Sequence, residues 1–293
     1  MNWTKKLILA AAVWAALGGA AEAAVKGEVP APADAQPAVE RRVTADARAA
    51  SAQQTADAEV MALLWMRTAA EYRALCYQGY NAAMAEIDRA LVDSRRDRPL
   101  AIVLDCDETV VDNTAAMAAD AARGSGLYTS PWWNQWVARG EAAALPGAAD
   151  FLNAVHAKGV AIFYVTNRLE STGYAATERN LRALGFPSVD REHLLLATDT
   201  GNKQIRFDQI AAKYDVVCYM GDNAGDLPIG TYGKDLADRN AVIDANKDRF
   251  GTKYIVFPNP AYGAWVSALA PHYFDLTPEE RSEVNRRLLT ESR

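Results

Sequence analysis

The chain has 293 residues, half of them hydrophobic, and a formal net charge of −6 at pH 7. A chain of this length can bury one sizeable core. Its negative charge argues against binding a nucleic-acid polymer, because such binding depends on cationic side chains that neutralise phosphates.

The N-terminus has the pattern of a secretory signal peptide. Lys5 and Lys6 precede an apolar stretch from Leu7 to about Leu17, and small residues follow up to Ala23. The stretch is too short to favour a membrane-spanning helix. We expect residues 1–23 to be cleaved and the protein to be periplasmic or secreted, without a stable membrane anchor. The alternative is an uncleaved anchor.

The rest of the chain divides by composition. Residues 24–50 are rich in alanine and proline, which predicts a flexible leader. From about Ala49 to Leu91, apolar residues recur at helical spacing and predict N-terminal helices. These apolar positions are Leu63, Leu64, Met66, Tyr72, Leu75, Tyr80 and Ile87. From about Leu100 to Pro258, apolar runs alternate with helical stretches, which is typical of an α/β domain with a parallel sheet flanked by helices. We predict one domain over residues 51–293.

Two carboxylates follow the first apolar run of this domain. Ile102–Leu104 reads as a buried parallel strand, and Asp105 and Asp107 come directly after it. In an open α/β sheet, ligands bind outside the carboxyl ends of the strands, so these acids should face a crevice. Two carboxylates in one crevice repel unless their roles are separated or a cation neutralises them. A bound divalent cation would do both.

Three further polar clusters support a site at this edge of the sheet. The apolar run 160–165 is followed by Thr166, Asn167 and Arg168, and the run 216–220 by a Gly-Asp-Asn-Ala-Gly-Asp segment that contains Asp222 and Asp226. Between these runs, the segment 202–206 supplies cations before an amphipathic helix. A lone Asp-x-Asp is weak evidence for a site. The ordered set of acids, hydroxyl, cation and acids is much harder to produce by chance.

At residues 105–113 and 221–226 the sequence resembles the haloacid dehalogenase superfamily. Within it, the sequence is similar to the class C, or non-specific, acid phosphatases, which include outer-membrane lipoprotein 5′-nucleotidases. The resemblance extends to residues 71–78 and 258–265 and covers roughly residues 55 to 290. Cys106 stands where an aliphatic residue is usual, and Thr166 where serine is common. Lipoprotein members need a cysteine at the cleavage point, whereas the first cysteine here is Cys76.

The resemblance implies a Rossmann-like parallel sheet with a small helical cap, inserted at about residues 110–150, over the active site. It implies a Mg²⁺-dependent acid phosphatase or 5′-nucleotidase that acts on small phosphate esters, among them nucleoside monophosphates, and it suggests a homodimer. Four aromatic residues lie in the cap segment, and most of them should pack the cap onto the sheet: Tyr128, Trp132, Trp133 and Trp136.

The resemblance also assigns roles to individual residues. Asp105 would attack phosphorus and form an aspartyl-phosphate, while Asp107 would protonate the leaving alkoxide and then activate water. The expected Mg²⁺ ligands are the side chains of Asp105 and Asp222 and the backbone carbonyl of Asp107, with Asn223 and Asp226 supporting them.

The phosphoryl group would be bound by Thr166, Asn167 and Lys203. Tyr262 resembles the position whose ring stacks on a nucleobase, and the alternative for Tyr262 is an aromatic residue packed in a turn. For Arg168, Arg206 and Glu108 we expect ion pairs on the surface or in the structure.

Two other functions stay open at this point. Another reaction of the superfamily is disfavoured because dehalogenases lack an acid at the Asp107 position, and because hydrolysis is simpler than a mutase reaction for an exported protein. A catalytically silent exported binding protein, such as a haem or ligand carrier, is the second alternative. None of the three histidines stands in a Cys-x-x-Cys-His haem-attachment pattern. Cys106 and Cys218 should be small buried thiols rather than nucleophiles.

Overall fold

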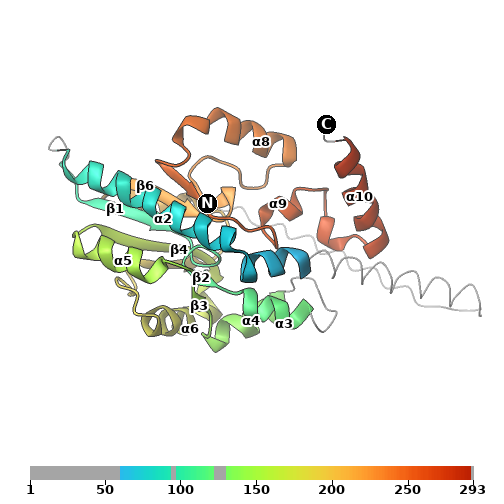
Figure 1. Ribbon diagram of the computed structural model, residues 1–293, viewed down its shortest axis with the longest axis horizontal. Helices are drawn as coiled ribbons and strands as arrows, with labels where there is room; N and C mark the ends of the chain where they lie inside the picture. The colour runs from blue at the N-terminus through green and yellow to red at the C-terminus, as the bar shows by residue number, and fades with distance from the viewer. Residues whose placement is uncertain (1–59, 94–96, 122–129, 292–293) are drawn as a thin grey trace, which may run out of the picture. The chain divides into compact units, whose positions relative to one another are not determined.

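A parallel sheet forms the centre of the protein. The computed structural model describes residues 60–93, 97–121 and 130–291, so the predicted signal peptide and leader lie outside the described residues. Five parallel strands lie in the order β5-β4-β1-β6-β7 (Figure 1). Their bounds are β1 Leu100–Leu104, β4 Ala161–Leu169, β5 Leu194–Ala197, β6 Asp215–Gly221 and β7 Tyr254–Val256. The predicted α/β fold with a parallel sheet is confirmed.

Helices cover both faces of this sheet because its strands are apolar on both sides. Alternate residues of a strand point to opposite faces. Leu104 of β1 therefore belongs to the same core cluster as Ile87 and Leu152, while its neighbour Val103 belongs to the second cluster with Phe207. The helices around the sheet are α2 Ala70–Leu91, α5 Ala148–Ala157, α6 Glu170–Ala183, α7 Gln204–Ala211 and α8 Leu236–Ala245.

The strand order brings the ends of β1 and β6 together. From β1 the chain continues through β4 to β5 on one side of the sheet, then returns to β6 and β7 on the other side. Ligands of open α/β sheets bind where the strand order reverses in this way. The register places Leu104 opposite Met220, and the backbone N–H of Asp105 donates to the carbonyl of Met220 at 2.9 Å. The residues that follow both strands therefore meet at one edge.

The segment between β1 and α5 forms a small layer of its own. It contains β2 Val111–Asp112, α3 Thr114–Ala121, α4 Ser130–Arg139 and β3 Ala143–Ala144, with β2 and β3 antiparallel. Trp133 and Trp136 of α4 are buried in the main core, as expected for side chains that pack this layer onto the sheet, and Trp132 is half-buried. Tyr128 lies outside the described residues.

The chain ends in short elements, namely α9 Ala264–Ser267, the 3₁₀ turn η3 Tyr273–Asp275 and α10 Pro278–Glu291. Two further 3₁₀ turns are η1 Ala224–Asp226 and η2 Lys247–Arg249. Among the described helices, none is long and apolar enough to cross a membrane.

The structure differs from the sequence-based expectation in two elements. The strand predicted to end at Val165 continues as β4 to Leu169, because Leu169 still pairs with Ala197 of β5. The N-terminal helical region is interrupted at Ala69, whose extended backbone separates the helical residues 60–68 from α2. Leu64 and Leu75, expected on an apolar face, are 46% and 40% exposed.

All three cysteines are buried and free. This confirms the interpretation of Cys106 and Cys218 as small buried thiols. Burial raises the pKa of Cys218 to about 12, so its thiol stays protonated and unreactive near neutral pH.

Helix α2 should contribute strongly to stability through Ile87, which is fully buried against the sheet. We expect Ile87→Ala to lower the free energy of unfolding by about 2–5 kcal/mol, because it removes packed methyl groups and leaves a cavity. The matched control is Ile205→Ala in α7, where the side chain is 62% exposed and the change should stay within about 0.5 kcal/mol. Urea unfolding measures both. Equal losses would contradict the docking of α2 on the sheet.

Candidate functional site

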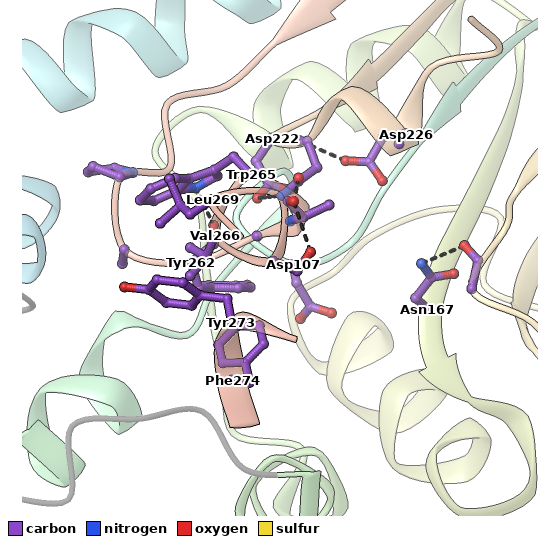
Figure 2. A pocket seen from close by; sticks show the side chains of 18 of the residues that line it. Asp107, Asn167, Asp222, Asp226, Tyr262, Trp265, Val266, Leu269, Tyr273 and Phe274 are labelled. Atoms are coloured by element: carbon purple, nitrogen blue, oxygen red, sulfur yellow. Dashed lines mark hydrogen bonds between the residues drawn. The ribbon is translucent and has the colours of Figure 1, made fainter. Parts of the chain in front are cut away.

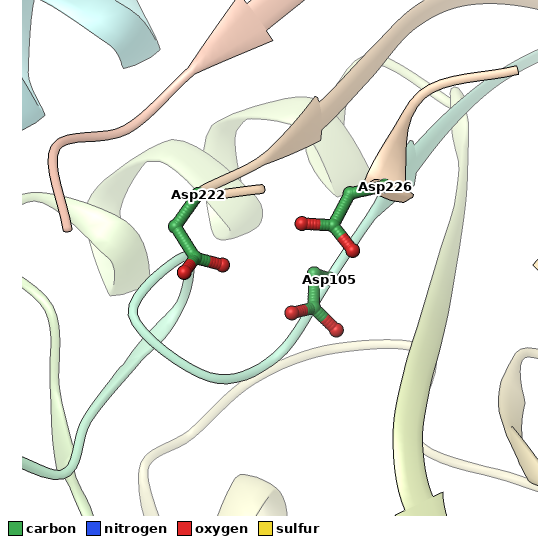
Figure 3. Close-up of side chains that lie close together, drawn as sticks. All are labelled: Asp105, Asp222 and Asp226. Atoms are coloured by element: carbon green, nitrogen blue, oxygen red, sulfur yellow. The ribbon is translucent and has the colours of Figure 1, made fainter. Parts of the chain in front are cut away.

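Three carboxylates meet at the carboxyl edge of the sheet. Asp105 follows β1, Asp222 follows β6, and Asp226 lies in η1 just beyond it. One oxygen from each of the three lies within 4.8 Å of the others, and the side chains converge (Figure 3). Like charges this close in a poorly hydrated site repel one another, so the cluster requires positive charge nearby.

Lys203 supplies part of that charge. Its Nζ lies 2.7 Å from Oδ1 of Asp105 and 2.6 Å from Oδ1 of Asp226, and its side chain is only 2% exposed. Although burial lowers the pKa of Lys203, the two carboxylates raise it above its ordinary value, so the ammonium stays charged. One ammonium does not balance three carboxylates. With all three acids ionised, the three carboxylates and the ammonium together carry a net charge of about −2.

This remaining charge is reflected in the pKa values of the acids. The pKa of Asp105 is raised to about 7, chiefly by burial and then by the neighbouring Asp226 and Asp107, despite the opposing effect of Lys203. The pKa of Asp222 is raised well above its ordinary value by burial and then by Asp226 and Asp105. The cluster is therefore unfavourable in its ionised form without a further cation.

A divalent cation with a preference for oxygen ligands fits this cluster in charge and donor type. Both oxygens of Asp226 already accept hydrogen bonds, Oδ1 from Lys203 and Oδ2 from the backbone N–H of Asn223 at 2.8 Å. Asn259 donates to Oδ2 of Asp222 at 2.8 Å. Within the described residues, Oδ2 of Asp105 and Oδ1 of Asp222 accept no hydrogen bond. These two oxygens are the natural direct ligands, with Asp226 in a supporting position.

Asp107 is in different surroundings. Arg168 holds it from Nε, at 3.1 Å from both carboxylate oxygens, and from Nη2 at 2.6 Å from Oδ1. Asn113 donates to the same Oδ1 at 2.9 Å. Asp105 thus belongs to the carboxylate and ammonium cluster, whereas Asp107 is paired with a buried guanidinium. Two acids of the same type, two residues apart, are placed to do different chemistry.

The expectation of ion pairs is right for one of three residues. Arg168 forms one, although it is buried and its partner is Asp107. Arg206 instead donates to neutral oxygens, the carbonyl of Thr166 at 2.6 Å and Oδ1 of Asn167 at 2.7 Å. These two hydrogen bonds therefore hold Thr166 and Asn167 of β4 in place.

For Glu108 the ion-pair expectation is also wrong. Glu108 is fully buried, has a left-handed backbone with φ of 50°, and accepts hydrogen bonds from Asn113 and the Tyr262 hydroxyl. Burial raises its pKa well above the ordinary value, and Asp107 and Asp222 raise it further. Glu108 connects the loop after β1 to the segment around Tyr262.

The two predicted phosphate-binding residues of β4 lie side by side but differ in exposure. Thr166 is fully buried, and its Oγ1 accepts a hydrogen bond from the backbone N–H of Arg168 at 3.2 Å, which leaves its own proton available for donation. Asn167 is exposed, and its Nδ2 donates to the carbonyl of Gly201 at 2.9 Å.

One cavity of about 1070 Å³ joins most of the predicted site residues (Figure 2). The predicted residues that line it are Asp105, Asp107, Asn167, Lys203, Asp222, Asn223, Asp226 and Tyr262. Thr166 is not among the lining residues. Asn113 and Asn259, which hold Asp107 and Asp222, had no predicted role. Their positions inside the matched segments 105–113 and 258–265 were the only available signal.

Comparison with known proteins identifies the fold and the kind of site. Residues 24–265 match the family described as HAD superfamily, subfamily IIIB (Acid phosphatase). The class C acid phosphatase from Bacillus anthracis is similar at 39% sequence identity and a TM-score of 0.75, over 80% of this chain and 97% of that chain. The structure of the class C acid phosphatase from Bacillus anthracis with tungstate bound is similar at 38% identity and a TM-score of 0.74, with the same coverage.

Metal binding to the carboxylate cluster should stabilise the folded protein. Mg²⁺ at about one hundred times its dissociation constant should add about 2.7 kcal/mol, which thermal unfolding detects as a rise in Tm that EDTA reverses. Asp222→Asn should remove most of this rise by removing a ligand charge. The metal-free variant should melt no lower than the wild type, because one repelling carboxylate is gone.

The matched control for the thermal experiment is Asp244→Asn on the exposed surface of α8, which should keep the full Mg²⁺ response. An equal rise in Tm for Asp222→Asn and the wild type would place the metal elsewhere.

Proposed function

Because this chain belongs to subfamily IIIB of the HAD superfamily, the acid phosphatases, we propose that it is a Mg²⁺-dependent phosphomonoesterase that hydrolyses nucleoside 5′-monophosphates and other small phosphate esters through an aspartyl-phosphate. The observation that carries the proposal is the separation of the two acids. Asp105 is held by Lys203 in the carboxylate cluster, and Asp107 is held by Arg168.

Hydrolysis of a phosphate ester depends on neutralising charge and on positioning, because the anionic phosphoryl oxygens repel a nucleophile. The side chains of Asp105 and Asp222 and the backbone carbonyl of Asp107 would hold Mg²⁺, whose charge would offset that of the phosphoryl group. The Bacillus anthracis relative binds tungstate, which is a tetrahedral oxyanion like phosphate. This supports an oxyanion site in the present chain.

In the first step, Oδ1 of Asp105, the oxygen that is not assigned to the metal, attacks phosphorus. The bond between phosphorus and the ester oxygen breaks as the new bond forms, and the alkoxide leaves with a proton from Asp107. Lys203 donates to this Oδ1 at 2.7 Å, so the attacking oxygen has a fixed direction. The same ammonium is close enough to the site to balance charge on the transferring group.

In the second step, Asp107 acts as a base. It takes a proton from a water molecule, the water oxygen bonds to phosphorus, and the bond to Asp105 breaks to release phosphate. Arg168 and Asn113 hold Oδ1 of Asp107, and this fixes the carboxylate against the same cavity through both steps. Thr166 and Asn167 would bind the phosphoryl oxygens beside Lys203.

Tyr262 supports the proposal of nucleotide substrates. It lines the cavity, and its hydroxyl donates to the buried Glu108. Its ring centroid lies 6.2 Å from that of Trp133. A ring that is held by a hydrogen bond and a neighbouring ring loses little conformational freedom when a base stacks on it. Any nucleobase offers a π face for such stacking.

The nucleophile can be tested by substitution. We expect Asp105→Asn to abolish phosphate release from p-nitrophenyl phosphate and adenosine monophosphate, because an amide cannot form the acyl-phosphate. EDTA should abolish turnover by the wild type, and Mg²⁺ should restore it. Asp244→Asn serves again as the surface control and should keep full activity. A folded, Mg²⁺-loaded protein that turns over no ester would favour the silent binding protein instead.

The role of Tyr262 can be tested with paired substrates. We expect Tyr262→Ala to lower kcat/KM for adenosine monophosphate by about fivefold or more, given about 1–3 kcal/mol for base stacking. The value for glycerol 2-phosphate, which has no ring to stack, should fall much less. Tyr262→Phe keeps the ring and should retain most of the nucleotide preference. Equal losses on both substrates in Tyr262→Ala would mean that the ring only packs in a turn.

A further inference from the structure

The end of the chain lines the same cavity as the catalytic acids. The family match ends at residue 265, and the cavity is lined beyond that point by a group of apolar and aromatic side chains. They are Val266, Leu269, Tyr273, Phe274, Leu288 and Leu289, which we name the C-terminal wall. The wall therefore lies beyond the segment that the family model matches.

The wall faces the polar end of the cavity. In Figure 2, the labelled residues Val266, Leu269, Tyr273 and Phe274 gather beside Tyr262, while the acids lie on the other side. Asp105, Asp107 and Lys203 also line this cavity. A phosphate ester with its phosphorus at Asp105 can therefore place its organic group in the space between the acids and the wall.

Hydrogen bonds between its elements hold the wall together. The Tyr273 hydroxyl in η3 donates to Oδ1 of Asn285 in α10 at 2.8 Å, and Nε of Arg281 donates to the carbonyl of Leu276 at 3.0 Å. Tyr273 is 6% exposed and Arg281 is 7% exposed. The turn and the helix therefore form one packed unit rather than a loose tail.

Large apolar side chains of the wall are nevertheless left in contact with water. Phe274 is 46% exposed and Leu289 is 79% exposed. Apolar surface in a concave site gains free energy when an apolar group displaces the water from it. The cavity of about 1070 Å³ is far larger than a phosphoryl group requires, so this gain is available to the rest of the ester.

We propose that the C-terminal wall is a subsite for the leaving group of phosphomonoesters with an extended apolar chain, such as medium-chain alkyl phosphates. The proposal rests on the proposed phosphomonoesterase function and names a substrate class for it. It commits to the substrate as the occupant because the wall is continuous with the catalytic acids inside one cavity.

The test is a series of alkyl phosphates used below their critical micelle concentrations. With the full chain and Mg²⁺, kcat/KM should rise from ethyl through butyl and hexyl to octyl phosphate, by up to about fourfold for each methylene group that the wall covers. The double variant Phe274→Ser with Leu289→Ser should lower the octyl-to-ethyl ratio by about tenfold. The matched control is Leu91→Ser with Val92→Ser, at exposed positions at the end of α2, and should keep the wild-type ratio.

A second measurement separates the subsite from the catalytic proposal. Alkyl phosphonates are not hydrolysed, so their binding, followed by calorimetry, reports on the wall even in an inactive protein. Tighter binding of octylphosphonate than of ethylphosphonate, lost in the Phe274→Ser and Leu289→Ser variant, supports the subsite even if no ester is turned over.

Other outcomes overturn the subsite. One is turnover of all esters at rates independent of chain length, with equal binding of both phosphonates; this leaves the phosphatase proposal intact. Another is a dimer in light scattering that the same double variant dissociates without changing the octyl-to-ethyl ratio. That result would assign the wall to a second copy of the chain.

Discussion

The two hydrogen bonds of the Lys203 ammonium are the interaction on which the site depends. They reach Asp105 after β1 and Asp226 after β6, so one buried cation ties together the ends of two neighbouring strands and the start of α7. A buried charge is tolerated only when its partners are well placed. Lys203 satisfies this condition yet leaves the cluster with excess negative charge. The same group of carboxylates therefore forms the buried ion pairs with Lys203 and provides the negative charge that a divalent cation would neutralise.

Close backbone packing fixes the acids as firmly as their charges do. A Cβ on Gly221 would lie 2.2 Å from Cβ of Asp226, and one on Gly263, where φ is +143°, would lie 2.3 Å from Nδ2 of Asn223. A side chain at Gly221 would force the turn that carries Asp226 to move, and one at Gly263 would be strained by the positive φ and would displace the Asn223 amide. The turn after β6 can therefore press Asp226 against the strand end, and Asn223 can reach the N–H of Ala264 at 2.9 Å. The carboxylate cluster and the segment around Tyr262 are therefore connected through the contact between Asn223 and Ala264.

The sequence indicates the acids but not the residues that hold them. Asp105 and Asp222 were predictable because each follows an apolar run, and parallel strands bring their carboxyl ends to one edge. Arg168 lies 61 residues from Asp107, and Asn259 lies 37 residues from Asp222, so only the folded chain reveals these pairs. Glu108 shows the limit most clearly. A charged residue suggested an ion pair, whereas the fold buries it and provides amide and phenol donors instead.

Glu108 also explains how chemistry and substrate choice are connected in this fold. It lies one residue after Asp107, and its carboxylate accepts a hydrogen bond from the Tyr262 hydroxyl. The loop that carries the catalytic acids therefore also fixes the position of Tyr262 on the aromatic side of the cavity. The strand ends are constrained by sheet pairing and charge, and their chemistry has little freedom to vary. In the described part of the segment after Trp265, no residue pairs with a strand of the sheet. It can change its side chains without disturbing the acids, and a specificity-determining surface is expected in such a segment.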